Sequence, residues 1–127
     1  MIEPNGQVVG HFSENIIFLL GLNIEVGTEI ILSPTTVEHI NRKHPEITGN
    51  LYEKAAEILL NPEYVGYSPR KNTIDFIVSE NERLRVPVRP ASDGIYYARS
   101  IFKLHKRDFE RLKRSGSIFP VDKTKKS

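Results

Sequence analysis

The chain of 127 residues contains no cysteine, so disulfides, thiolate nucleophiles and thiolate metal sites are excluded. This agrees with a reducing compartment, and a cytoplasmic location is expected. Long apolar runs are absent too. The run from Ile16 to Leu22 is far too short to span a bilayer. Glu3 and Glu14 precede it, where a secretory signal would carry basic residues, so neither a signal peptide nor a membrane partner is expected.

Basic residues are absent from residues 1–41, which hold five acids. With +2 for the whole chain and −5 up to residue 41, the remainder carries +7. Residues 83–114 alone contain ten lysines or arginines against three acids. A half this basic predicts an anionic partner, and phosphate is the commonest candidate.

The patterns of apolar residues predict one α+β domain. Two N-terminal helices should pack on an antiparallel sheet of about four strands, and a basic C-terminal helix should follow. Helices are expected from 34 to 44, from 51 to 60 and from 103 to 115, and strands at 64–67, 73–79, 83–89 and 95–102. Short extended segments are expected at 8–9, 29–32 and 117–121. The run 16–22 suits a helix or a strand, because periodicity does not separate the two.

The segment 83–89 alternates apolar and basic residues, so one face of the sheet should be rich in arginine. Pro87 on that face argues for an edge strand or a bulge. After Gly94 the sequence allows two assignments of which residues face each side of the sheet. In one, Arg99 faces the arginine side of the sheet; in the other, Ser100 does.

Residues 35–45, Thr-Thr-Val-Glu-His-Ile-Asn-Arg-Lys-His-Pro, hold two of the four histidines. Ser33 has the residue type of an N-cap and Pro34 that of a first helical position. Pro45 disfavours helical geometry at the residue before it, so the helix should end at His44. On a helical wheel His44 continues an apolar stripe, whereas His39 lies on the opposite side.

A small set of motifs then narrows the fold class. They are His-Ile-Asn-Arg-Lys-His-Pro-Glu at 39–46, Ile-Leu-Leu-Asn-Pro-Glu-Tyr-Val at 58–65, Arg-Ser-Ile-Phe at 99–102 and Phe-Glu-Arg-Leu-Lys-Arg-Ser-Gly at 109–116. Together they resemble the small phage-encoded nuclease families grouped with barnase, EndoU, the tRNA-cleaving colicins and RelE, known as the BECR fold. A looser similarity points to the BrnT type of RelE-like toxin. The resemblance implies a nuclease domain at 30–120, an N-terminal extension of unclear role at 1–29 and a basic, disordered tail at 121–127.

The resemblance implies a metal-independent endoribonuclease of toxin or phage type, in which the ribose 2′-hydroxyl attacks the adjacent phosphorus without a cofactor. Such a reaction needs an acid and a base near neutrality and cations around the phosphorane. The expected catalytic residues are His44, His39, Arg85, Arg99, Tyr97 and Ser100. The expected RNA contacts are Arg42, Lys43, Arg83, Arg89, Lys103 and His105. No metal site is expected, because the carboxylates of the basic half are scattered and the two helix histidines are five residues apart rather than four.

Other interpretations stay open. In one, the chain is a non-catalytic module that binds RNA or inhibits a host enzyme, and His44 only ends a helix. The expected partners are RNA and an inhibitor protein of the immunity or antitoxin kind. Alternatively, the acidic segment 1–29 folds over the basic cleft and mimics phosphate.

Overall fold

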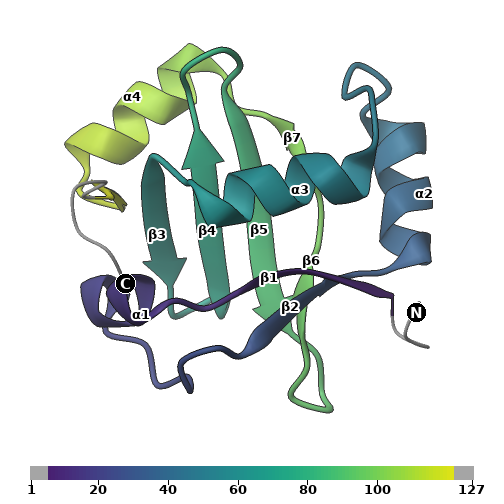
Figure 1. Cartoon of the computed structure of the whole chain (residues 1–127). Helices are drawn as coiled ribbons and strands as arrows, with labels where there is room; N and C mark the ends of the chain where they lie inside the picture. Colours follow the sequence, from purple (N-terminus) through teal and green to yellow (C-terminus); the bar gives the residue numbers. More distant parts are fainter. Residues whose placement is uncertain (1–5, 122–127) are drawn as a thin grey trace.

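The computed structural model describes residues 6–121, which form four helices and an eight-stranded sheet (Figure 1). In chain order the elements are β1 (Gln7–His11), α1 (Glu14–Leu20), β2 (Glu29–Leu32), α2 (Pro34–Lys43), α3 (Leu51–Leu60), β3 (Tyr64–Ser68), β4 (Thr73–Val78), β5 (Leu84–Pro90), β6 (Tyr96–Ala98), β7 (Phe102–Lys103), α4 (Lys106–Arg114) and β8 (Ile118–Pro120).

The strand order is β1-β2-β6-β5-β4-β3-β8, and β7 also pairs with β5. All pairs are antiparallel except β2 with β6, which is parallel. The α+β class is confirmed, but the expected count of about four strands was too low. The strands 64–67, 73–79 and 83–89 were recognised as separate strands because each alternates or is β-prone. The short extended segments expected at 8–9, 29–32 and 117–121 overlap β1, β2 and β8, which also join the sheet. β7 begins at the last residue of the strand expected at 95–102.

The segment 16–22, for which the sequence allowed a helix or a strand, forms most of helix α1. In α1 the Ser13 hydroxyl accepts a hydrogen bond from the Ile16 N–H at 3.2 Å, and Gly21 ends the helix at φ +62°. The expectation of two N-terminal helices was therefore one helix short. Residues 6–29 supply an edge strand and a helix to the same fold.

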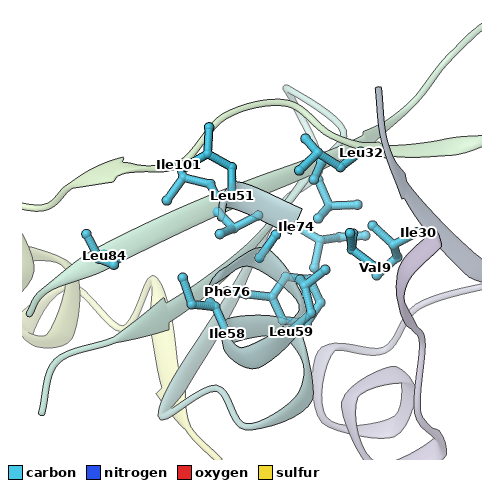
Figure 2. Close-up of a cluster of buried hydrophobic side chains, with 14 of the residues drawn as sticks. Val9, Ile30, Leu32, Leu51, Ile58, Leu59, Ile74, Phe76, Leu84 and Ile101 are labelled. Carbon is cyan, nitrogen blue, oxygen red and sulfur yellow. The ribbon is translucent and has the colours of Figure 1, made fainter. Parts of the chain in front are cut away.

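One face of the sheet is covered by α3, which crosses in front of β4 and β5 in Figure 1. Asn50 begins this helix as predicted, since its Oδ1 accepts hydrogen bonds from the N–H groups of Tyr52 and Glu53. The buried stripe of α3 is also the predicted one: Leu51, Ala55, Ile58 and Leu59. Figure 2 shows three of these side chains beside apolar residues of β1, β2, β4 and β5.

The opposite face of the sheet is covered in part by α4. Ile77 points away from α3 because it alternates with Phe76, and it packs with Leu104, Phe109 and Ile118. α4 is shorter than expected: it begins at Lys106, since Phe102–Lys103 pairs with β5 as β7. This face also carries the arginines of β5.

A bulge separates β6 from β7. Residues 99–101 stand opposite only two residues of β5, 86 and 87. The Arg99 N–H donates to the Pro87 carbonyl at 2.7 Å. β5 lies between β4 and β6, so the alternative of an edge strand is wrong. Pro87 instead lies opposite the bulge between β6 and β7. The expected tail at 121–127 lies outside the described residues except for Val121, whose N–H donates to the Glu63 carbonyl.

Candidate active site

α2 ends where the sequence predicted. Ser33 accepts a hydrogen bond from the Thr36 N–H at 3.1 Å, and Pro34 is the first helical residue. At the other end, the His44 N–H donates to the Ile40 carbonyl at 2.7 Å. His44 then leaves the helical conformation at φ −133° and ψ 62°, because Pro45 follows it. The C-terminal end of α2 therefore presents the His44 side chain to the sheet.

The His44 imidazole is held by two neighbours. It stacks on the Phe102 ring, with centroids 5.7 Å apart and planes inclined by 28°. Its Nδ1 lies 3.7 Å from a carboxylate oxygen of Glu46, which is an ion-pair distance when the ring is protonated. The side chain stays 30% exposed, so the ring is oriented and still accessible.

His44 lies on the wall of a cleft of about 470 Å³ between the end of α2, the strands β5 and β7, and the start of α4. The cleft combines cationic, acidic, histidine and apolar side chains. Its lining residues are His44, Glu46, Arg85, Phe102, Lys103, Leu104, His105, Asp108, Arg111 and Leu112.

Arg85 enters this cleft from β5 as half of an ion pair. Its Nε donates to Asp75 Oδ1 at 3.0 Å, and its Nη2 donates to Asp75 Oδ2 at 2.8 Å. The Asp75 side chain is 8% exposed and that of Arg85 26%. The guanidinium also lies over Phe102, with Cζ 5.9 Å from the ring centroid. Two of its five N–H groups are thus used by Asp75, which leaves three for a ligand.

The third wall is the connection from β7 into α4. His105 is the N-cap residue of α4, but its side chain makes no capping hydrogen bond, so its ring nitrogens are not used by the helix end. Lys103 is exposed beside it. Asp108 and Arg111, one turn apart on α4, form an ion pair at 3.0 Å. The N-terminus of α4 adds the positive end of a helix dipole.

Four of the predicted site residues line this cleft: His44, Arg85, Lys103 and His105. The others lie outside the cleft. Arg42 pairs with Glu38 at 3.3 Å on the exposed side of α2, next to Lys43, and His39 is half-buried on the same helix. Arg83 lines a separate hollow.

The remaining predicted residues lie on β5 and around the bulge. Arg89 is exposed near the end of β5 and is paired in register with Tyr97. Tyr97 is buried, and the Arg99 guanidinium covers its ring at 5.0 Å, so Arg99 keeps to the arginine side of the sheet. Arg99 Nε and Ser100 Oγ are buried, and neither has a hydrogen-bond partner among the described residues.

Several cleft residues were missed by sequence reasoning. Asp75 was noted only as one of several scattered carboxylates. A usable signal existed for it: Asp75 faces Pro87 in the register of the 73–90 hairpin, diagonal to Arg85 on the same face. Phe102 was assigned to a strand without a role. Glu46 and Arg111 fall within the motifs at 39–46 and 109–116, but nothing in the motifs gives them a role, and Asp108 has no signal that distinguishes it from an ordinary surface charge.

The acidic N-terminal segment does not take part in the cleft, as far as the described residues show. Residues 6–29 contain β1, α1 and the first residue of β2, and none of them lines the cleft, so the idea of a phosphate mimic is not supported for this part of the segment. Across residues 6–121, no three His, Cys, Asp or Glu side chains gather as a metal site requires. In the same range, no helix is both long and apolar enough to cross a membrane.

The fold and the cleft define a small α+β domain with a cleft lined by two histidines, three cations and two carboxylates. Residues 6–111 match the family model described as phage-Barnase-EndoU-ColicinE5/D-RelE like nuclease 3. The chain therefore belongs to this family of phage-type nucleases, which confirms the resemblance drawn from its motifs. The match includes β1, α1 and every residue that lines the cleft except Leu112. Comparison with curated proteins and with solved structures gave no match.

Proposed function

We propose that the chain is a metal-independent endoribonuclease and that the cleft between α2, β5 and α4 is its active site. The observation that supports this most directly is the shared contact with Phe102. One histidine and one arginine from separate elements, His44 and Arg85, both approach this ring. A titratable ring and a phosphate-binding cation are thereby held side by side in a cleft large enough for a nucleotide.

His44 is assigned the role of general base. Its Nδ1 lies 3.7 Å from a carboxylate oxygen of Glu46, so the carboxylate helps to orient the ring. Nε2 lies on the other side of the ring and is the atom that takes the proton from the ribose 2′-hydroxyl. Histidine suits this step because its ordinary titration range is near neutral pH.

Arg85 and Lys103 are assigned to the phosphate. Three N–H groups of the Arg85 guanidinium remain after the two bonds to Asp75, and they can bind the oxygens on which charge develops in the phosphorane. The ion pair with Asp75 fixes the guanidinium before the substrate arrives. The positive end of α4 supports the same charge.

His105 is assigned to the leaving group. It lies on the α4 wall, while His44 lies on the α2 wall, so two titratable rings border one cleft. In-line displacement needs a base and an acid on either side of the phosphorus, and this arrangement supplies both. His39, Tyr97, Arg99 and Ser100 are not part of the proposed reaction, since they do not line the cleft.

The same basic surface also supports a second candidate, a module that binds RNA without cleaving it. An inhibitor protein, if one acts on this chain, would need to cover the cleft. The two candidates differ in what they require of His44. Only a nuclease needs the His44 side chain for more than packing.

The test is cleavage of a mixed single-stranded RNA in EDTA, with analysis of the product ends. We expect cyclic phosphate ends from the wild type, and we expect His44→Ala to lower kcat about 10²- to 10⁴-fold while RNA affinity is kept. His39→Ala is the matched control, since it removes a histidine from the same helix but outside the cleft. Intact RNA with the wild-type protein, together with salt-sensitive binding, would favour the module that only binds.

A further inference from the structure

A second hollow adjoins the cleft. It has a volume of about 250 Å³ and is lined by Asn81, Glu82 and Arg83 of the β4–β5 turn and by residues 103–105. Residues 103–105 also line the cleft, so they form a ridge between the two spaces. A nucleic acid strand that crosses this ridge would place one part in each hollow.

The walls of the second hollow are fixed by hydrogen bonds. The Leu104 N–H donates to the Arg83 carbonyl at 3.0 Å, and Arg83 Nε donates to the Leu104 carbonyl at 3.1 Å. The turn itself is held by the residue just before β3: the Glu63 carboxylate accepts hydrogen bonds from the Ser79 N–H, the Ser79 hydroxyl and the Glu80 N–H at 2.8 to 3.0 Å. Asn81 is therefore carried on a turn that is anchored on both sides.

The polar groups of the hollow suit a nucleobase better than a phosphate. The hollow is of mixed charge: Arg83 and Lys103 line it together with Glu82, which is paired with Lys54 of α3 at 3.4 Å, and Arg83 Nε is already bonded to the Leu104 carbonyl. The Asn81 side chain offers a donor and an acceptor side by side, the pattern that pairs with the edge of a base. The hollow itself, at about 250 Å³, is smaller than the range of about 300–1,000 Å³ typical of pockets for drug-sized ligands, and this size suits one base.

We propose that this second hollow binds the nucleobase next to the cleaved phosphodiester and that Asn81 selects that base. The inference rests on the proposed function in that the ligand is RNA. Lys103, on the ridge, contacts the phosphate between the two nucleotides. The chain then prefers one base at one side of the bond that it cuts.

The experiment uses short oligonucleotides with a single ribose, so that only one step can be cleaved, and varies the base on either side of it. A second set carries a 2′-O-methyl group on that ribose and reports Kd by fluorescence anisotropy without cleavage. The wild type, Asn81→Ala and Asn41→Ala are compared. Asn41 is the matched control because it is exposed on α2 and lines neither hollow.

We expect the wild type to discriminate between bases at one position by about 5- to 150-fold, the range of one bidentate contact. Asn81→Ala should abolish this preference in both kcat/KM and Kd, and Asn41→Ala should retain it. Wild-type preference in Asn81→Ala, or equal Kd values for every base with the wild type, would overturn the subsite. If the wild type cleaves nothing but binds the 2′-O-methyl set with an Asn81-dependent preference, the subsite stands and the nuclease proposal fails.

Discussion

The pair between Asp75 and Arg85 connects the stability of the sheet to the cleft, and removing its two partners should have unequal effects. Arg85→Met leaves the Asp75 carboxylate, whose side chain is only 8% exposed, without its cation. Asp75→Asn leaves the guanidinium, which is 26% exposed and can be partly solvated. It also keeps one oxygen as an acceptor for Arg85.

The expected losses follow from these environments. A buried charge that loses its partner destabilises a protein by about 3–5 kcal/mol, and we expect Arg85→Met to fall in this range. Loss of a charged hydrogen bond at a partly exposed site amounts to about 1.5–3 kcal/mol, which we expect for Asp75→Asn. Against a typical total of about 5–15 kcal/mol, both variants should still fold at room temperature. Urea unfolding followed by circular dichroism measures both values, provided that the slope m is unchanged.

The same substitution separates binding from catalysis. Asp75→Asn adds one positive charge to the site, so RNA affinity at low salt should stay the same or rise. The guanidinium is no longer fixed by two hydrogen bonds, however, and misplacement of a phosphate-binding group lowers kcat by about 10- to 100-fold. Ser68→Ala, on the neighbouring strand and outside the cleft, is a control for general effects on the sheet.

The reverse order of stabilities, with Asp75→Asn the more damaging change, would contradict the assigned burial effects. Wild-type cleavage rates in Asp75→Asn would mean that the ion pair has no part in orienting Arg85.

Two further predictions concern Glu46 and Tyr96. Glu46→Gln removes a partly exposed ion pair with His44, and such pairs contribute about 0.2–1 kcal/mol. We therefore expect kcat to fall by no more than about fivefold, with Kd for RNA unchanged. A loss of 100-fold or more in kcat would mean that Glu46 itself transfers a proton. Burial, with a smaller contribution from Tyr67, raises the pKa of Tyr96 above its usual value of 10.0. Above about pH 10 the unfolded chain loses this proton first, so the folded state binds more protons and stability falls as pH rises. In Tyr96→Phe, the unfolding free energy should fall less steeply than in the wild type between about pH 9 and pH 11, and it should be similar to the wild type near pH 7. Urea titrations at each pH would measure this. The same slope in both proteins would contradict the prediction.

Much of the local structure was predictable because its causes lie within a few residues. Ser33 and Asn50 are N-caps whose residue type alone identifies them, and Pro45 ends α2 by restricting the residue before it. The alternation of Leu84 to Arg89 fixed which residues of β5 face the core. The position of His44 follows from such local rules.

The assembly of the cleft depends on the register between strands, which local sequence patterns do not define. One extra residue between β6 and β7 ends the simple alternation, so sequence parity alone did not decide between Arg99 and Ser100. The pairing of Asp75 with Arg85 needs the alignment of two strands. The arrival of His105 in the cleft depends on how α4 packs over Ile77, which is a long-range contact.

The charges of the cleft show what it is suited to do. Arg85, His44 and Arg111 each lie within 4 Å of a carboxylate, at 2.8, 3.7 and 3.0 Å. Such pairing fixes the geometry of the cations but cancels most of their long-range field. Under the proposed function, attraction of RNA from a distance must therefore come from the exposed cations outside the cleft. These include Lys43 and Arg89, which the sequence marked as RNA contacts and which the fold leaves exposed. Arg42 is exposed too, but it is paired with Glu38 at 3.3 Å and contributes less to this field. If the cleft orients the phosphate and the surrounding surface captures the strand, as we propose, removal of the outer cations should weaken binding uniformly, whereas changes in the cleft should act on the chemical step.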